Sequence, residues 1–428
     1  MYKPVHEIAV RIWGQMVGAL ALDPQRNFYA FEYDPAFIRS GIELAPLTMP
    51  LSMAGEPFIF TNLPEATFYR LPAFIADALP DKFGNALINS WMAQRGVEDS
   101  SITPLDRLAY MGKRGMGALE FKPARSPSAG ASTTAISLAQ LVESARLAIQ
   151  GNVGTNSSAS KVLAQIIKVG TSAGGARAKA VIAWNQKTEE IRAGQFDVEP
   201  GFEHWLIKFD EIEPEGVLRN SKNYGRIEYA YYCMAKAAGI SMSTCRLLEK
   251  DGRAHFMTKR FERIGNNKIH MQTLCGMANL DFNQVASHDY SQLFSVVEKL
   301  DLKYQAKEEV FRRMAFNVVA ANCDDHTKNF SFLLRKKATW TLAPAYDVTH
   351  AYNPNGQWNH QHLMSVNGKF NKISRSDLLA VARRFGIGTA DKVIDEVVQS
   401  VEAWPDHARK AGVAVDKITR IQNDFQLF

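Results

Sequence analysis

The stretch that decides the fold is Asn322-Cys323-Asp324-Asp325-His326-Thr327-Lys328-Asn329, which follows an apolar helical run (310–321) and precedes a predicted strand (330–334). So many charged and polar side chains together are unsuited to a protein core, although an ordinary helix-to-strand loop can have this composition. Asp324 and Asn329 have the separation of the base aspartate and the metal-binding asparagine in protein-kinase catalytic loops. The stretch therefore favours phosphoryl transfer, with Asp324 accepting the proton of a hydroxyl and Asn329 offering an amide oxygen to magnesium.

A second metal ligand is expected just after the next predicted hairpin, which pairs residues 330–334 with 339–342. Asp347 follows that hairpin, where a kinase places its second metal-binding aspartate. An aspartate in a solvated turn is the alternative interpretation. His326 has no second histidine at i+4, so it is interpreted as a scaffold for the loop, and Lys328 is a further candidate at the nucleotide site.

Candidate nucleotide-binding residues lie earlier in the chain. A loop of small residues contains Ser172, Gly174, Gly175, Ala176 and Arg177, and its glycines let backbone amides approach phosphate oxygens closely. Lys208 lies on a predicted strand, like the kinase lysine that pairs phosphate oxygens, and Glu228 on the next helix is its candidate partner. A solvated strand lysine is the alternative for Lys208.

The segment 257–263 joins the two halves of the chain, and its backbone is where a kinase reads the adenine edge. Lys259 and Phe261 are the candidate nucleotide contacts in it. Packing of Phe261 in the core, beside solvated arginines, is the alternative interpretation.

The composition of the chain limits the class of protein and the number of domains. The 428 residues are 46% hydrophobic and 22% charged, which excludes wholesale disorder and allows two to four domains. The formal net charge of +6 permits contact with phosphate or nucleic acid without requiring it. The four cysteines have no C-x-x-C spacing, which disfavours a structural zinc site. Neither a signal peptide nor an apolar run of about 20 residues is present, so we expect a cytoplasmic protein without a membrane segment.

Other nucleotide-binding motifs are missing from the sequence: no G-x-G-x-x-G follows a predicted strand, and no P-loop occurs. The pattern predicts a strand-rich first half, a Ser/Ala/Pro/Gly-rich linker (123–136) and a helix-rich second half, which indicates an α+β protein with segregated lobes. The helices predicted in the second half are 289–300, 306–321, 375–386, 390–403 and 414–424.

Four stretches, in order, resemble HipA-type serine/threonine kinases, the toxin halves of bacterial toxin–antitoxin pairs. They are residues 104–121 (PLDRLAYMGKRGMGALEF), 172–179, 324–331 and 342–347. The resemblance implies a bilobal protein-kinase-like fold with an extra N-terminal subdomain (1–125), a strand-rich N-lobe with the phosphate loop (126–262) and a helical C-lobe with the catalytic loop (263–428).

The resemblance also implies ATP and Mg²⁺ as cofactors, Asp324 as catalytic base, Asn329 and Asp347 as metal ligands and Lys208 as the phosphate lysine. Ser172 matches the family's autophosphorylated serine, whose modification ejects the phosphate loop and inactivates the enzyme. A phosphate there would add about −1.5 to −2 charges next to the phosphates of ATP. Thr171 is a possible second phosphosite, and a serine capping a turn is the alternative for Ser172.

The implied partners are a small helix-turn-helix antitoxin (HipB-like), operator DNA reached through that antitoxin, and a protein substrate such as an aminoacyl-tRNA synthetase or another translation factor. Arg177 departs from the glutamine common in the family, which leaves the loop contacts open. Two alternatives stay open: a small-molecule phosphotransferase with the same catalytic logic, and a non-catalytic docking partner of a DNA-bound antitoxin.

Overall fold

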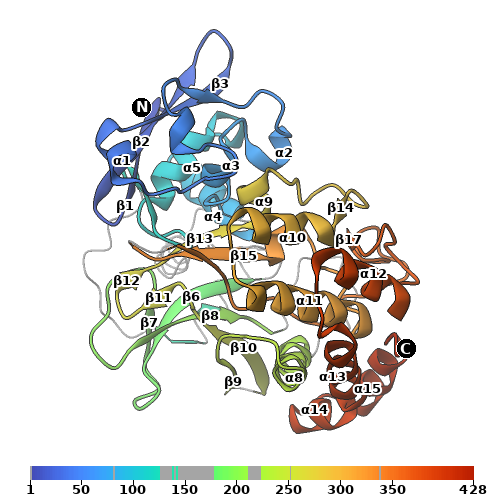
Figure 1. The fold of residues 1–428 in the computed structure, drawn as a ribbon. Coiled ribbons are helices and arrows are strands. Elements are labelled where there is room, and N and C mark those ends of the chain that lie inside the picture. Colours follow the sequence, from blue (N-terminus) through green and yellow to red (C-terminus); the bar gives the residue numbers. More distant parts are fainter. Residues whose placement is uncertain are drawn as a thin grey trace. The chain divides into compact units, whose positions relative to one another are not determined.

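The structure, a computed structural model, describes residues 2–80, 82–125, 137–138, 141–142, 178–210, 223–250, 252–336 and 339–428 (Figure 1). The chain divides into two compact units, each described by itself. Unit 1 comprises residues 1–222, 257–271 and 335–337, and unit 2 comprises residues 223–256, 272–334 and 338–428. These bounds differ from the predicted three-part division, because 223–256 groups with the second half of the chain. The predicted loop of residues 171–177 lies outside the described residues.

The first sheet of unit 1 is antiparallel and has the strand order β4-β3-β2-β1-β5. Alternation of buried and more exposed residues along β1 puts Ile8, Val10 and Ile12 on its buried face. The strands are β1 (Glu7–Ile12), β2 (Gln15–Asp23), β3 (Phe28–Tyr33), β4 (Phe58–Ile59) and β5 (Leu119–Lys122), and the helices of this part are α1 (Pro35–Ser40), α2 (Glu65–Phe68), α3 (Ala73–Ala76), α4 (Lys82–Ala93) and α5 (Pro104–Met111).

Residues 104–121 connect separate parts of unit 1 through hydrogen bonds and one close backbone contact. Thr103 and Asp106 form a capping box at the start of α5, and buried Asp106 also accepts a hydrogen bond from the backbone N–H of Val5 at 2.9 Å. Gly117 has a φ of +72°, and a Cβ there would lie 2.8 Å from the backbone nitrogen of Met271. Glycine therefore permits a close approach that any side chain would block.

The second sheet of unit 1 contains β6 (Lys179–Trp184), β7 (Ile191–Ala193) and β8 (Glu203–Lys208) in the order β7-β6-β8. Residues 257–259, the end of β10 (Arg253–Lys259), continue this order beside β8. Every residue of β6 is buried, as expected for the centre of a covered sheet. A small hairpin, β11 (Arg263–Ile264) with β12 (Asn267–Lys268), follows.

Unit 2 is rich in helices. In it α11 packs against α13, and α14 packs against both α8 and α15 (Figure 1). Trp404 of α14 is fully buried. The helices are α8 (Tyr224–Ala237), α9 (Leu274–Ala278), α10 (Tyr290–Lys299), α11 (Tyr304–Val319), α12 (Arg375–Phe385), α13 (Ala390–Glu402), α14 (Trp404–Lys410) and α15 (Val415–Gln422). The five helices predicted for the second half are therefore confirmed, whereas α14 was not predicted.

Short strands complete unit 2. The hairpin β15 (Ser331–Leu334) with β16 (Trp340–Leu342) confirms the predicted one, and residues 272–273, the end of β13 (His270–Thr273), continue the strand order beside β15. β9 (Cys245–Lys250) pairs with β10, and β14 (His288–Asp289) runs parallel to β17 (Met364–Ser365). Together the units form a mixed α/β protein with several sheets. None of the helices in the described part of the chain has both the length and the apolar character needed to cross a bilayer.

Candidate active site

The predicted catalytic loop begins where α11 ends. Ala321 has a φ of +52°, a left-handed conformation that alanine rarely adopts, and it turns the chain away from the helix. The backbone N–H of Asn322 donates to the Asn317 carbonyl at 2.9 Å, and the Asn322 amide donates to the Asn317 side chain at 2.9 Å. These bonds hold the start of the loop on the last turns of α11.

Hydrogen bonds within the loop bring Asp324 and Asn329 together. Asn329 donates from Nδ2 to the Asp324 carbonyl at 2.7 Å, and its backbone N–H donates to the His326 carbonyl at 2.9 Å. His326 accepts a bond from the Lys328 N–H at Nδ1, 3.2 Å away, and so caps the short 3₁₀ turn Thr327–Asn329. Since the amide nitrogen of Asn329 faces Asp324, its Oδ1 is the atom oriented to act as a ligand.

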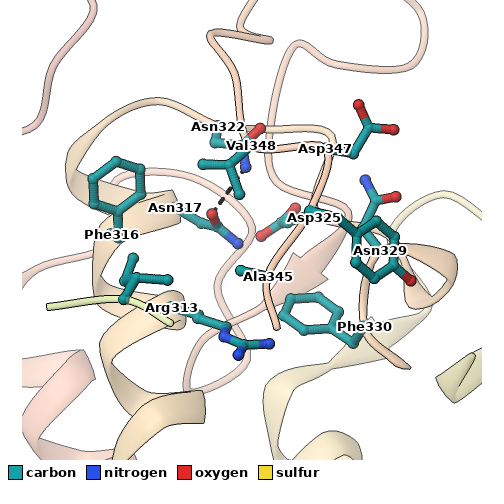
Figure 2. A pocket seen from close by; sticks show the side chains of 12 residues that line it. Arg313, Phe316, Asn317, Asn322, Asp325, Asn329, Phe330, Ala345, Asp347 and Val348 are labelled. Atoms are coloured by element: carbon teal, nitrogen blue, oxygen red, sulfur yellow. Dashed lines mark hydrogen bonds between the residues drawn. The ribbon is translucent and has the colours of Figure 1, made fainter. Parts of the chain in front are cut away.

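The β15–β16 hairpin returns the chain so that Asp347 lines the same pocket as Asn329 (Figure 2). The Tyr346 hydroxyl donates to the Lys328 carbonyl at 2.6 Å, which fixes the returning chain to the loop. The Ala345 N–H donates to the Ser241 carbonyl at 2.8 Å on the other side. Asp347 itself has a φ of +55°; backbone conformations of this kind cluster at active sites.

A buried polar network lies beneath the loop. Asp325, 1% exposed, accepts hydrogen bonds from three directions: the Tyr290 hydroxyl at 2.8 Å, the His362 Nδ1 at 3.0 Å and the Leu363 N–H at 2.7 Å. The Tyr290 hydroxyl accepts in turn from the Asn317 amide at 2.9 Å. A buried carboxylate with this many donors is satisfied, so Asp325 anchors the loop in place.

The groups around Asp324 shift its pKa in opposite directions. Its carboxylate is 38% exposed; the surrounding protein removes part of its water and raises its pKa, as does the neighbouring charge of Asp347. His326, with Nε2 3.8 Å from Oδ1, and the Trp358 indole N–H, 2.9 Å from Oδ1, both oppose that rise. The result is a pKa above the ordinary value for an aspartate, which suits a group that accepts a proton.

The expected site residues are divided between the two units. Lys208, Lys259 and Phe261 lie in unit 1, whereas Asp324, Asn329, Asp347, His326 and Lys328 lie in unit 2. Lys259 forms an ion pair with Glu203 at 2.5 Å. Glu228, the candidate partner of Lys208, is buried in unit 2. Thr171, Ser172, Gly174, Gly175, Ala176 and Arg177 lie outside the described residues.

Sequence reasoning missed the residues that hold the loop from a distance: Trp358, His362, Tyr290 and Asn317. A signal that could have found part of this set is the polar and aromatic composition of residues 352–362, just after Asp347.

The donor set at the pocket fits magnesium. Asn329 and Asp347 offer one amide and one carboxylate group, and Mg²⁺ binds through few protein oxygens while it keeps waters and phosphate oxygens as its other ligands. No group of three or more His, Cys, Asp or Glu side chains among the described residues could hold a metal ion. The two-ligand pair is therefore the arrangement that the described part of unit 2 offers.

The chain is therefore a mixed α/β protein with several sheets, and its candidate active site is a polar loop between the helix α11 and the β15–β16 hairpin. The HipA-like C-terminal domain matches residues 171–404, and the HipA N-terminal domain matches residues 8–122. The first of these matches covers more than half of the chain, and the chain belongs to the HipA family.

One solved structure and two curated proteins are similar to the chain. HipA from the Shewanella oneidensis toxin–antitoxin complex of HipA, HipB and operator DNA superposes with a TM-score of 0.65 at 18% identity, over 97% of this chain and 95% of that chain. "Putative kinase Y4dM" of Sinorhizobium fredii is 24% identical over 34% of this chain, and a "Putative kinase" of Haemophilus influenzae is 29% identical over 22% of it. The matched segments span 36% and 29% of those two relatives.

Proposed function

We propose that the protein is an ATP- and Mg²⁺-dependent serine/threonine protein kinase that acts as a bacterial toxin. One observation carries the proposal: Asp324 and Asn329 are hydrogen-bonded within one loop, and the following hairpin brings Asp347 to the pocket that Asn329 lines. A base, an amide ligand and a carboxylate ligand in this chain order are the parts that phosphoryl transfer requires in kinases. The names of the two kinase relatives support the same class of reaction.

In this mechanism Asp324 would accept the proton of the acceptor hydroxyl as its oxygen bonds to the γ-phosphorus of ATP, while the bond from that phosphorus to the bridging oxygen breaks and ADP leaves. The Trp358 N–H and His326 lie on the Oδ1 side of the carboxylate, so Oδ2 is the oxygen left to face the acceptor. Asn329 and Asp347 would hold the metal, with the amide of Asn329 kept in orientation by its bond to the Asp324 carbonyl. When bound, Mg²⁺·ATP supplies the phosphoryl group and offsets its charge.

Unit 1 would contribute the nucleotide contacts. Lys208, at the end of β8, is the candidate for the phosphates, together with the backbone of Gly174, Gly175 and Ala176. Phe261 is the stronger adenine candidate, because Lys259 is already paired with Glu203.

Regulation by self-modification is part of the proposal. Phosphate on Ser172, or on Thr171, would repel the phosphates of ATP and inactivate the enzyme. Arg177 would influence this step, because its guanidinium can pair with a phosphate group both when the loop covers the nucleotide and when it is ejected.

The proposed partners follow from the Shewanella oneidensis assembly, which contains HipB and operator DNA. We propose a HipB-like helix-turn-helix antitoxin for this chain, with operator DNA bound through it. The proposed substrate is a protein of translation, such as an aminoacyl-tRNA synthetase.

The test is ADP release and phosphate transfer by the purified full chain with Mg²⁺·ATP and a cell extract as the source of protein acceptors. We expect transfer to serine or threonine by the wild type, and loss of at least about a hundredfold in Asp324→Asn and Asp347→Ala. Asp406→Asn, which changes a surface aspartate of α14, is the matched control and should retain activity. Transfer only to small alcohols would instead identify a small-molecule phosphotransferase.

A further inference from the structure

The segment after Asp347 encloses the candidate catalytic loop. Residues 351–363 contact it at three successive positions within unit 2. The Ala351 N–H donates to the Ala321 carbonyl at 3.3 Å, and the Trp358 indole N–H donates to Asp324 Oδ1 at 2.9 Å. Further along, His362 and Leu363 both bond Asp325. One segment therefore holds both neighbouring acids, the candidate base and the buried anchor beside it.

The part of the segment that carries Trp358 is fixed by its own hydrogen bonds. The Asn353 N–H donates to the Asn359 carbonyl at 3.0 Å, and the Asn359 amide donates to the Ala351 carbonyl. His360 Nδ1 lies 3.0 Å from the Gly356 carbonyl. These bonds close the loop upon itself on both sides of Trp358, so the position of the indole does not depend on the Asp324 contact alone.

Asp324 needs such an external support. Its side chain is 38% exposed, and within its own loop Asn329 bonds its backbone carbonyl rather than its carboxylate. A carboxylate on a surface loop can rotate about two side-chain bonds, whereas a general base must present one oxygen to the acceptor. The indole N–H is a single donor that fixes Oδ1 and leaves Oδ2 toward the acceptor.

We propose that Trp358 is a positioning residue that orients the Asp324 carboxylate for proton acceptance, and that residues 351–363 are the element that sets this geometry. The inference rests on the proposed function, since it concerns the same base. In this role Trp358 acts through Asp324, to whose carboxylate its indole N–H donates.

The decisive variant is Trp358→Phe, which keeps an aromatic ring near His326, whose ring centroid lies 6.4 Å from that of Trp358, and removes the N–H donor together with part of the ring. The matched control is Trp404→Phe, which removes a comparable indole bond, to the Ile418 carbonyl at 3.1 Å, in the helical core. We expect kcat to fall about tenfold to a hundredfold in Trp358→Phe, the effect of losing one hydrogen bond to a charged group, with KM for ATP unchanged. Trp404→Phe should lower the melting temperature and leave kcat unchanged.

A second measurement does not require turnover. In protein labelled with ¹⁵N-tryptophan, the indole resonance that disappears in Trp358→Phe should shift in Asp324→Asn, while that of Trp404 stays in place. An unmoved Trp358 resonance would overturn the proposal even for an inactive protein.

The positioning role of Trp358 and the proposed kinase function can be refuted separately. Wild-type kcat in Trp358→Phe, or equal changes in kcat and in KM for ATP, would overturn the positioning role while an inactive Asp324→Asn still upheld the proposed function. Full activity in Asp324→Asn would overturn the proposed function and, with it, this role of Trp358.

Discussion

Tyr290→Phe removes one buried hydroxyl and should lower the free energy of unfolding several times more than the same substitution at an exposed tyrosine. The Tyr290 side chain is fully buried; its hydroxyl donates to the Asp325 carboxylate at 2.8 Å and accepts from the Asn317 amide at 2.9 Å. A hydrogen bond to a charged group is worth about 1.5–3 kcal/mol, and an amide left without its acceptor costs about 1–3 kcal/mol. Because one oxygen serves both bonds, we expect a combined loss of about 2–4 kcal/mol in the free energy of unfolding.

The assay is equilibrium urea unfolding at pH 7, followed by circular dichroism, on the wild type and two variants. Tyr304→Phe is the control: that ring is 43% exposed, and its hydroxyl lies 3.5 Å from Thr389 Oγ1. It should change the free energy of unfolding by no more than about 0.5 kcal/mol. Equal losses in Tyr290→Phe and Tyr304→Phe would refute the conclusion that a buried network anchors the loop.

Three further predictions concern charge. Burial lowers the pKa of His362, but the adjacent Asp325 carboxylate outweighs it and raises that pKa to about 10. Since the folded pKa lies above the unfolded value of about 6.5, this contribution to stability is complete below about pH 6.5 and is lost as the pH rises through about 10. The difference in unfolding free energy between wild type and His362→Asn should therefore shrink between pH 6 and pH 10, and a growing difference would contradict the assignment. Burial raises the pKa of Asp377, yet the hydrogen bond from Lys369 and those at the start of α12 hold it below the usual range, so its contribution is present above about pH 4 and disappears as the pH falls. Asp377→Ala should cost about 1 kcal/mol at pH 7 in urea unfolding and less at pH 2; no cost at pH 7 would be the contrary result. Asp347→Asn should raise the Mg²⁺ concentration needed for half-maximal ADP release at fixed ATP at least about tenfold, and an unchanged requirement would exclude Asp347 as a ligand.

Local features of the fold were predictable because local sequence determines them. The hairpin of residues 330–342 and the helices that became α10 to α13 follow from periodicity and capping residues, such as Asp289 and Gln292 at the start of α10. The spacing of Asp324 and Asn329 likewise identified a loop in which the two residues are joined by a hydrogen bond.

The structure explains the glycine within β2, since a Cβ at Gly18 would lie 2.1 Å from the Glu32 carbonyl oxygen. The helix α14 was not predicted, for an identifiable reason. α14 begins at Trp404 directly after α13, so its start signals, a proline and Asp406 in the first turn, adjoin the end of the preceding helix and do not stand out as a new element.

The supports of the site were not predictable from local patterns. Trp358 reaches Asp324 across 34 residues, and Tyr290 reaches Asp325 across 35. Such contacts depend on how the helices and the segment 351–363 pack, and a single sequence carries no periodicity that reports them. The left-handed backbone at Asp347 was likewise not predictable, because the surrounding hairpin and loop impose its conformation.

The most direct test of the central claim is the intact mass of the full chain, first freed of any phosphate and then incubated with Mg²⁺ and ATP, with Asp324→Asn alongside. The account predicts that the wild type gains phosphate, mapped to Ser172 or Thr171, and that Asp324→Asn gains none. An equal gain in both proteins would remove Asp324 from the reaction, and no gain in either would contradict phosphoryl transfer to the chain itself.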